Sequence, residues 1–378
     1  MLAEILRSAL CALGRELAAW KPSRERALFG ARAVLAVALS VQLANQLHLS
    51  NTWWAAISAF VVAQTTWSDS LKRAVQRLLG TVLGACLGTL LGPWIGDRPW
   101  FFIPAMGVIG ATAVYRGDRS QAAYAWLLGG ITALMVTFEA HLLGSMRATG
   151  AFALMRIVEV AVGTASCVLV VGAFDLCLQW AGGKRISVTL PGHPAVTTAG
   201  IPATLPQGGA AALGLSGALA VAILAALSYA LSMPGLMQAM VTVVAVLILP
   251  QAAIAVPGRR PVIEKMTHRL IGCLLAGAVG LALLPLMQGA ALACMIALAV
   301  GVWVGCHVQT GLEGATYIGR QFTIAFIMVF VQDHGWSADP GPALTRLSGI
   351  LAGIAVLAAV MIATRRLPGA LGAQDTVA

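Results

Sequence analysis

The chain has 378 residues, of which 59% are hydrophobic and 10% are charged. A soluble domain carries about 25% charged residues, so this composition excludes an ordinary soluble protein and indicates a lipid bilayer as the solvent. The net charge of +10 would suggest nucleic acid as a partner of a soluble protein. Here the basic residues follow membrane topology instead, and we expect no nucleic acid partner.

The first 26 residues form a basic amphipathic segment without the apolar core of a signal peptide. Leu2, Ile5, Leu6, Leu10 and Leu13 share one helical face, which predicts a cytoplasmic helix lying in the membrane interface. Twelve apolar segments follow, and helices are expected because no alternating barrel pattern occurs. The predicted spans are 27–48, 52–67, 78–96, 99–115, 121–143, 152–176, 210–231, 235–256, 267–286, 289–308, 317–334 and 343–364.

An internal repeat divides the chain into two halves. The run that begins Arg77-Leu78-Leu79-Gly80 returns 192 residues later as Arg269-Leu270-Ile271-Gly272. This period is too long for a solenoid unit and indicates a duplicated membrane protein. Six spans return the chain to its starting side, so both halves should have the same orientation. We therefore predict an all-α integral membrane protein of about 12 transmembrane helices, built as two parallel six-helix repeats.

The predicted organisation has five parts. These are a cytoplasmic N-terminal segment at 1–26, a first six-helix repeat at 27–180, a cytoplasmic linker at 181–209, a second repeat at 210–366 and a cytoplasmic tail at 367–378. Twenty of the 24 Lys and Arg residues fall on one side of this topology, which places both termini in the cytoplasm. The seven cysteines lie mostly inside apolar runs without metal-ligand spacing, so we interpret them as small core residues.

The repeated glycines and basic residues suggest two roles. Gly80, Gly84, Gly88 and Gly92 recur at steps of four, which predicts close packing of another helix and leaves a substrate path as the alternative. The basic segment that contains Arg77 is either ordinary membrane anchoring or an anion-attracting vestibule at the cytoplasmic mouth. The candidate substrate-binding residues of this group are Arg77, its repeat partner Arg269, and the polar residues Gln64 and Gln251, which otherwise hydrogen-bond neighbouring helices.

Ionisable residues in the sixth and twelfth spans are further candidates. Arg156 and Glu159 lie three residues apart on one face, so they form either a structural ion pair or a site for a carboxylate and a proton. Arg346 takes the same place 190 residues later, with Gly349 in place of the Glu, which makes it the better anion candidate. The candidate proton-coupling residues are Glu159 and the pair Asp333 and His334, for which a solvated loop is the alternative.

The sequence lacks the common catalytic motifs. We find no P-loop, no HExxH, no GxSxG elbow and no dinucleotide fingerprint. We therefore expect no enzymatic activity, no cofactor and no bound metal. Uphill transport would need an ion gradient or a partner protein.

Three runs in the first half resemble a known family. They are WWAAISAFVVAQ at 53–64, LKRAVQR at 71–77 and LLGTVLGACLG at 78–88, and the second half repeats them more weakly around Gln251, Arg260 and Arg269. They resemble the fusaric acid resistance (FUSC) and aromatic acid exporter family of bacterial inner-membrane proteins. Many members carry a sizeable cytoplasmic domain between their halves, where this chain has only the short linker. The resemblance implies export of aromatic carboxylic acids across the bacterial inner membrane, together with a periplasmic adaptor protein.

These inferences together predict a multi-pass inner-membrane exporter of small organic anions, driven by the proton gradient. Arg156 and Arg346 would hold the carboxylate of the substrate, and an apolar path would accept its aromatic body. The expected partners are the lipid bilayer, the adaptor protein and a second copy of the chain in a homo-oligomer. Two alternatives stay open: a passive anion channel, and a non-transporting membrane subunit of an envelope complex.

Overall fold

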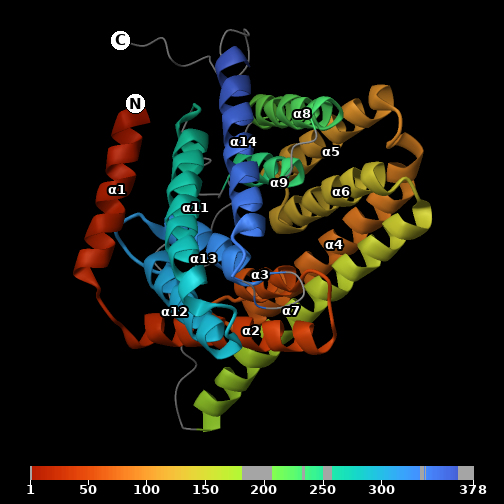
Figure 1. Ribbon diagram of the computed structural model, residues 1–378. Helices are drawn as coiled ribbons and strands as arrows, with labels where there is room; N and C mark the ends of the chain where they lie inside the picture. The colour runs from red at the N-terminus through yellow and green to blue at the C-terminus, as the bar shows by residue number, and fades with distance from the viewer. Residues whose placement is uncertain are drawn as a thin grey trace. The chain divides into compact units, whose positions relative to one another are not determined.

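The computed structural model describes residues 2–180, 207–231, 235–249, 258–332, 336 and 338–364, and its regular elements are helices (Figure 1). The N-terminal helix α1 (Leu2–Ala19) precedes two series of six. The first series is α2 (Arg24–Gln46), α3 (Thr52–Val62), α4 (Trp67–Ile95), α5 (Pro99–Arg119), α6 (Ala123–Leu143) and α7 (Met146–Trp180). The second is α8 (Gln207–Ala230), α9 (Leu236–Leu247), α11 (Arg260–Met287), α12 (Ala291–Gln309), α13 (Thr316–Phe330) and α14 (Gly341–Ala363).

Each predicted span corresponds to one of these helices, although some bounds differ. The helix α4 begins at Trp67 rather than at 78, because the basic amphipathic segment before the apolar run is itself helical. Among the described helices, eight are long and apolar enough to cross a membrane: α2, α4, α6, α7, α8, α11, α12 and α14. The described part of the chain is therefore helical and indicates a multi-pass membrane protein, while the count of twelve spans stays a prediction.

The helices α3 and α9 are too short to cross a bilayer. They have 11 and 12 residues, which gives a length of about 16–18 Å against a hydrocarbon core of about 30 Å. After α3 the chain turns at once into α4, and the Ser70 hydroxyl fixes the turn. It accepts a hydrogen bond from the Gln64 backbone N–H at 3.0 Å and donates one to the Thr66 carbonyl at 2.9 Å.

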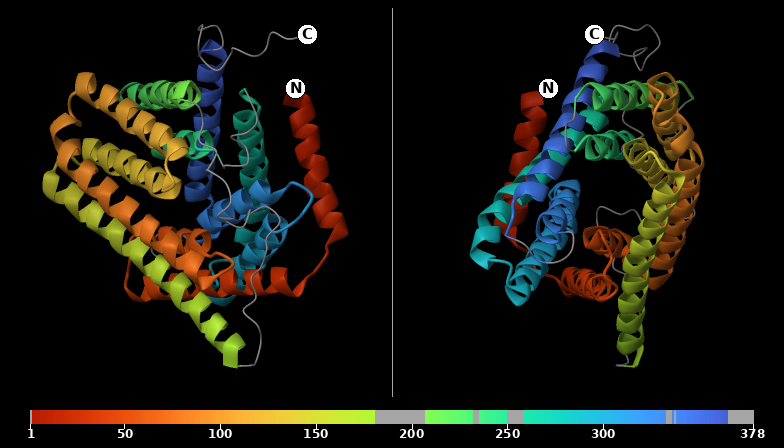
Figure 2. Two further views of the ribbon diagram at one scale, coloured as in Figure 1. Left: turned by 180° about the vertical axis from the view of Figure 1, so that it is seen from behind. Right: turned by 45° about the vertical axis from the view of Figure 1, so that its right-hand side comes forward.

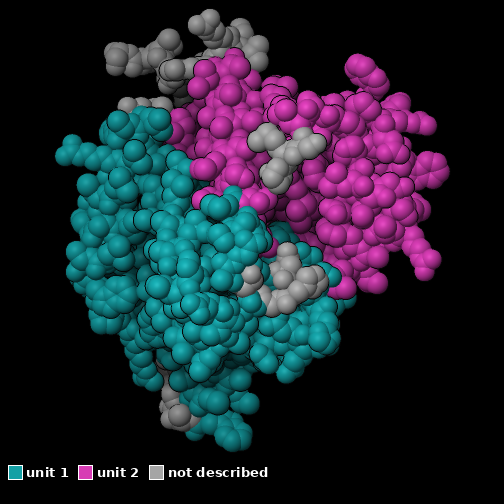
Figure 3. All heavy atoms as spheres, in the orientation of Figure 1, with its two compact units in different colours: residues 1–78, 158–199, 267–344 teal, residues 79–157, 200–266, 345–378 magenta. Residues whose placement is uncertain are grey.

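The chain forms two compact units (Figure 3). The first contains residues 1–78, 158–199 and 267–344, and the second contains residues 79–157, 200–266 and 345–378. Each unit draws helices from both halves of the sequence, and α4, α7, α11 and α14 contribute residues to both units. The predicted domains at 27–180 and 210–366 follow the sequence repeat, whereas the two compact units combine segments of both halves. The predicted domains therefore stay a prediction.

The same packing pattern occurs inside each unit. In the first unit α2 packs against α3 and α12, while α13 packs against α12 and α3. In the second unit α8 packs against α9 and α5, while α6 packs against α5 and α9. Figures 1 and 2 both show α5 and α8 side by side. In both units, then, the first and second helices of one half pack on the fourth and fifth helices of the other. This pattern supports an internal repeat, whose arrangement as two parallel halves stays a prediction.

Glycines of α4 and α11 bring helix backbones into direct contact. A Cβ atom at Gly80 would lie 2.5 Å from the Ala125 carbonyl oxygen of α6, and one at Gly84 would lie 2.3 Å from that of Gly129. In the second half, a Cβ at Gly272 would lie 2.6 Å from the Ile318 carbonyl oxygen of α13. The predicted close packing of the small-residue faces is confirmed, and its partner in each half is the fifth helix.

The sixth helices of the two halves are packed in the same way. A Cβ at Gly163 of α7 would lie 2.0 Å from the Ala55 carbonyl oxygen of α3. One at Gly353 of α14 would lie 2.5 Å from the Ala239 carbonyl oxygen of α9. Gly163 and Gly353 are 190 residues apart, the same offset as Arg156 and Arg346, so the repeat extends to the packing of the sixth helix on the second.

The helix α1 packs on the first unit through a buried carboxylate. Glu16 is 3% exposed, and it accepts hydrogen bonds from the Arg26 guanidinium and from the backbone N–H groups of Leu312 and Glu313. Trp20 stacks on His307 with ring centroids 3.8 Å apart. The buried face of α1 is Ile5, Ala9, Ala12 and Glu16, whereas Leu2, Leu6 and Leu10 stay exposed. The location of α1 in the membrane interface stays a prediction, in which these exposed leucines would face the lipid.

The glycine contacts lead to a first prediction. Gly84→Ala should lower the free energy of unfolding by roughly 1–3 kcal/mol, because the added methyl group meets a backbone carbonyl that cannot move aside. The control is Gly150→Ala in α7, where a Cβ would lie 3.8 Å from Thr89 and alanine improves helix propensity by up to ~1 kcal/mol. Thermal unfolding of the purified variants in detergent measures the difference. Equal stability of the two variants would contradict close packing at Gly84.

The buried carboxylate of α1 leads to a second prediction. Glu16→Gln should release α1, because an amide accepts weaker hydrogen bonds than a carboxylate and leaves Arg26 without its ion-pair partner, at a cost of about 1.5–3 kcal/mol. Hydrogen exchange of the amides in residues 2–19 should rise, while exchange in α14 stays unchanged. Glu4→Gln is the control, since Glu4 is exposed. Unchanged protection of α1 in the Glu16 variant would count against this attachment.

Candidate functional site

A buried arginine of α11 stands at the centre of a polar network in the first unit. Arg269 is 5% exposed, and its Nη1 donates a hydrogen bond to Gln321 Oε1 of α13 at 2.7 Å. The Tyr317 side chain of α13 also hydrogen-bonds with Arg269. A buried guanidinium group is costly unless its donors are hydrogen-bonded, so amide and hydroxyl partners of this kind are what the position requires.

The repeat partner of Arg269 is also buried. Arg77 of α4 is 4% exposed and belongs to the first unit as well. The sequence repeat extends to the tyrosine, because Tyr124 precedes Tyr317 by 193 residues. The sequence interpretation did not connect these tyrosines with the buried arginines, although the chain has only 4 tyrosines and two of them share the repeat. This sparse residue type was the signal that could have found them.

The second pair of predicted arginines belongs to the second unit. Arg156 of α7 is 3% exposed, and its Nη2 lies 3.7 Å from the Met135 sulfur of α6. Arg346 of α14 is half-buried. The four predicted arginines are thus divided by repeat position, with Arg77 and Arg269 in one unit and Arg156 and Arg346 in the other.

Glu159 and Gln64 have structural contacts with the two ends of α3. Glu159 is fully buried, and its Oε1 accepts a hydrogen bond from the backbone N–H of Asn51, the N-cap residue of α3, at 2.9 Å. A carboxylate at a helix N-terminus stabilises that end of the helix. Gln64 Nε2 donates to the neighbouring Ala63 carbonyl at 2.7 Å, just beyond the C-terminus of α3. The remaining candidates Gln251, Asp333 and His334 lie outside the described residues.

A polar cluster in the second unit was missed by the sequence interpretation. Asp118, near the end of α5, is 4% exposed, and its Oδ1 accepts a hydrogen bond from the Leu249 backbone N–H at 3.0 Å. Lys265 Nζ donates to the carbonyl oxygens of Ala245, at 2.8 Å, and Ile248. A cation and an anion therefore hold the C-terminal end of α9. In the sequence, Asp118 stands between Arg116 and Arg119 and looks like part of a solvated loop.

An equivalent arrangement follows α3 in the first unit. Arg32 is 3% exposed, and its guanidinium donates to the Thr65 carbonyl oxygen at 3.1 Å and to Asp175 Oδ1 at 2.7 Å. Its carbon CZ also lies 5.7 Å from the ring centroid of Phe174. Both short helices are thus followed by carbonyl groups that a buried or half-buried cation satisfies.

Three rings gather around one carbonyl in the second unit. His141 Nδ1 lies 2.7 Å from the Gly96 carbonyl oxygen, and the Tyr229 hydroxyl donates to the same oxygen. The two ring centroids are 4.3 Å apart, and that of Phe102 is 5.1 Å from His141. His141 is thus part of an aromatic cluster beside the Gly96 carbonyl.

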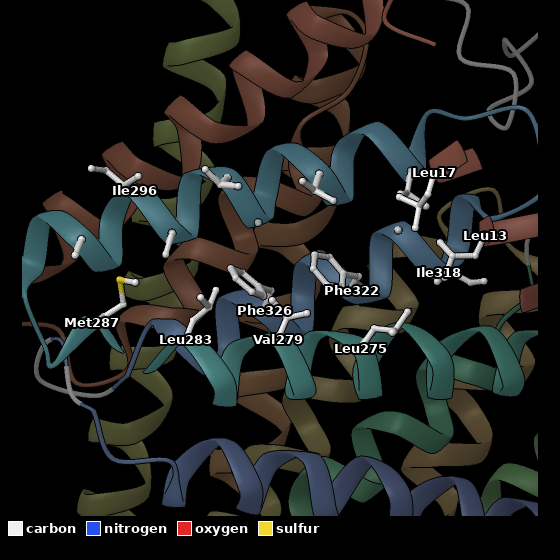
Figure 4. Close-up of a pocket in the computed structure, with 17 residues that line it drawn as sticks. Leu13, Leu17, Leu275, Val279, Leu283, Met287, Ile296, Ile318, Phe322 and Phe326 are labelled. Atoms are coloured by element: carbon white, nitrogen blue, oxygen red, sulfur yellow. The ribbon is translucent and has the colours of Figure 1, made fainter. Parts of the chain in front are cut away.

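The first unit contains an apolar cavity of about 630 Å³. Its walls are α11, α12 and α13, and Leu13 and Leu17 of α1 lie at one end (Figure 4). Leu275 and Val279 of α11 lie opposite Phe322 and Phe326 of α13 in this view. The volume is within the usual range for a ligand pocket. Its lining has no charged side chain, so it suits an aromatic ring or an acyl chain and offers nothing to a carboxylate.

Metal binding finds no support in the described part of the chain. No group of three or more His, Cys, Asp or Glu side chains there could hold a metal ion.

Buried guanidinium groups on long apolar helices define the class: a multi-pass helical membrane protein with polar sites inside its helix packing. Residues 26–176, from α2 to near the end of α7, match the Fusaric acid resistance protein family (FUSC), which confirms the resemblance seen in the sequence. No curated protein and no solved structure matches the chain. The family match and the apolar helices together indicate a membrane transporter.

The Arg269 network leads to a third prediction. Gln321→Leu should destabilise the protein by about 1.5–3 kcal/mol, because it removes a hydrogen bond to a buried charge. The double variant Arg269→Met/Gln321→Leu should recover much of this loss, since the charge that needed a partner is gone. Thermal unfolding in detergent measures these two variants and the single variant Arg269→Met, which completes the cycle.

The control for this cycle is Arg260→Gln. Arg260 pairs with Glu264 on an exposed helix surface, where such pairs contribute at most about 0.5 kcal/mol. Additive effects of the Arg269 and Gln321 substitutions would show that the two side chains are energetically independent.

Proposed function

We propose that the protein exports small organic anions, with aromatic carboxylic acids as the substrate class, and that the proton gradient drives the export. The family match supports transport of this kind. We place the protein in the bacterial inner membrane with both termini in the cytoplasm, in agreement with the distribution of its basic residues. A periplasmic adaptor would carry the substrate onward.

The observation that carries this proposal is the burial of Arg269 inside the apolar helix packing. A charged residue buried in the helix packing of a membrane protein usually serves a substrate or ion pathway, because its cost must be compensated. A guanidinium suits a carboxylate, since its planar fork of donors matches two oxygens. The uncharged side chains of Gln321 and Tyr317 both hydrogen-bond with this guanidinium group.

The other candidate residues extend the same chemistry. We propose that Arg77, Arg156, Arg269 and Arg346 attract and bind the carboxylate group, with Gln64 and Gln251 as polar groups along the path. Glu159 and the pair Asp333 and His334 are proposed to exchange protons. The apolar cavity beside α13 supports an aromatic substrate body, because it accepts a ring and repels charge.

A fourth prediction tests the function directly. Cells that contain the protein and its adaptor should lose one or more labelled aromatic acids faster than cells without it, and collapse of the proton gradient should stop this loss. Arg346→Ala should abolish the difference, because a small apolar side chain cannot bind the carboxylate. Arg260→Ala is the matched control, since Arg260 is exposed. Membrane insertion of each variant is checked by its abundance in the membrane fraction.

Two other results would replace this proposal with its rivals. Loss of the acid that ignores the gradient would favour a passive anion channel. Loss of no acid from the panel, with the protein inserted and the adaptor present, would favour a non-transporting subunit of an envelope complex.

A further inference from the structure

Three segments that are far apart in the sequence meet at the C-terminal end of α9. Asp118 comes from α5, Lys265 from α11, and the backbone of Ala245 to Leu249 from α9 and the residues after it. Asp118 Oδ1 accepts the Leu249 N–H, while its Oδ2 is buried and has no hydrogen-bond partner among the described residues. Lys265 donates to two carbonyl groups of the same backbone.

Few charged groups face Asp118. Lys265 is the charged residue that acts on it. The helices α8 and α9, which pack against α5, contain no Asp, Glu, Lys, Arg or His within their bounds, and residues 250–257 contain none either. The helix α6 also packs against α5, and its Glu139 and His141 lie near its C-terminal end, where His141 contacts the Gly96 carbonyl just before the start of α5. On α5 itself the guanidinium groups of Arg116 and Arg119 lie beside Trp126 and Tyr115. The carboxyl group is thus held by one backbone N–H and one neighbouring cation.

The ionisation of Asp118 is set by two opposing effects. Burial disfavours the charged carboxylate and raises its pKa from the ordinary value of 3.8 to about 7, although the Leu249 hydrogen bond and the Lys265 charge both act to lower it. This carboxyl group lies beyond the predicted span 99–115, near the end of α5. Within the predicted topology this is the cytoplasmic end of the helix, so the group could exchange protons with the cytoplasm.

We propose that Asp118 is a proton-binding site that couples protonation to the position of the α9 C-terminal end during transport. This inference rests on the proposed function and names a proton site distinct from Glu159, Asp333 and His334. The carboxylate holds Leu249 by a charge-assisted hydrogen bond and attracts Lys265. A bound proton removes both effects, because a neutral acceptor makes a weaker bond and has no charge for Lys265. The end of α9 is then held less tightly.

The repeat places different chemistry at the equivalent positions. The residue 192 positions after Asp118 is Thr310, and the residue 192 positions before Lys265 is Arg73. Threonine cannot ionise, and Thr310 instead accepts a hydrogen bond from Arg26 at 3.2 Å. The duplication therefore kept a cation at this place in both halves, while only one half has the carboxyl group.

The fifth prediction tests the proton site with Asp118→Asn in proteoliposomes that contain the full chain. The wild-type protein should move a labelled aromatic acid with a rate that changes around pH 7, and an imposed proton gradient should drive accumulation. The Asn variant should lose both the pH dependence and gradient-driven accumulation, while exchange of the acid without a gradient persists. Asp69→Asn is the matched control, since Asp69 is an exposed acidic residue at the start of α4, and it should behave as wild type.

The pH dependence of the protein's thermal stability tests the proton site without a transport assay. Because the folded protein raises the pKa of Asp118, it binds this proton more tightly than the unfolded chain does. The resulting stabilisation is fully present below the ordinary pKa and is lost as the pH rises through about 7. The apparent Tm of the wild-type protein should therefore fall as the pH rises from about 4 to about 7 and level off above this range, and the Asn variant should lack this fall. Lys265→Gln should move the wild-type midpoint to higher pH, since it removes a charge that lowers the pKa.

The outcomes separate the two proposals. A wild-type pH profile of Tm that persists in Asp118→Asn, or an unmoved midpoint in Lys265→Gln, would overturn the proton site. A profile lost in Asp118→Asn, together with no transport of any acid by the wild-type protein, would support the proton site and overturn the proposed function. Full gradient-driven accumulation by the Asn variant would overturn the coupling.

Discussion

The packing of this protein depends on helix backbones that touch one another directly. Inside a bilayer, apolar side chains gain nothing by leaving lipid for protein, so helices associate through close van der Waals contact and polar bonds. Glycine provides the close contact, as at Gly84 against Gly129 and at Gly163 against Ala55. These contacts leave no room for a side chain. The short distance between the paired helices therefore depends on glycine at these positions.

Close helix packing creates a second constraint at the ends of the short helices. The last carbonyl groups of α3 and α9 have no partner within the helix, and surroundings poor in water make an unpaired carbonyl costly. Arg32 bonds the Thr65 carbonyl after α3, and Lys265 bonds two carbonyls at the end of α9. Cations suit these positions because the C-terminal end of a helix carries partial negative charge. These hydrogen bonds fix both cations beside the C-terminal ends of the short helices.

The sequence was sufficient for the helices and for the glycine contacts, because both follow from local patterns. The hydropathy pattern predicted the order of the helices, and glycines at every fourth position predicted the closely packed face of α4. Their ends were less predictable: α9 stops at Leu247 rather than near 256, where no local signal changes before Pro250. Patterns along one helix also could not identify partners across helices. The contacts of Arg269 with Gln321 and of Asp118 with Leu249 depend on helix packing, and no short-range spacing encodes them.

The duplicated halves are most informative where they differ. If the two halves were identical, every side chain would occur twice in equivalent positions. The repeat alone would then give no reason to place the substrate and the coupling proton at different sites. The glycine contacts are kept in both halves, because each half needs the same helix spacing. Two buried carboxyl groups are not kept: Asp118 corresponds to Thr310, and Glu159 corresponds to Gly349. Both carboxyl groups belong to the first half and lie at the ends of the short helices, Glu159 at the start of α3 and Asp118 at the end of α9. Because helix ends carry unpaired backbone groups that respond to charge, a carboxyl group placed there can change the position of a short helix when it gains a proton, whereas threonine and glycine cannot. From the asymmetry of the repeat we therefore propose that protons are exchanged at the ends of α3 and α9, and that the arginines retained in both halves provide the positive charge for an organic anion.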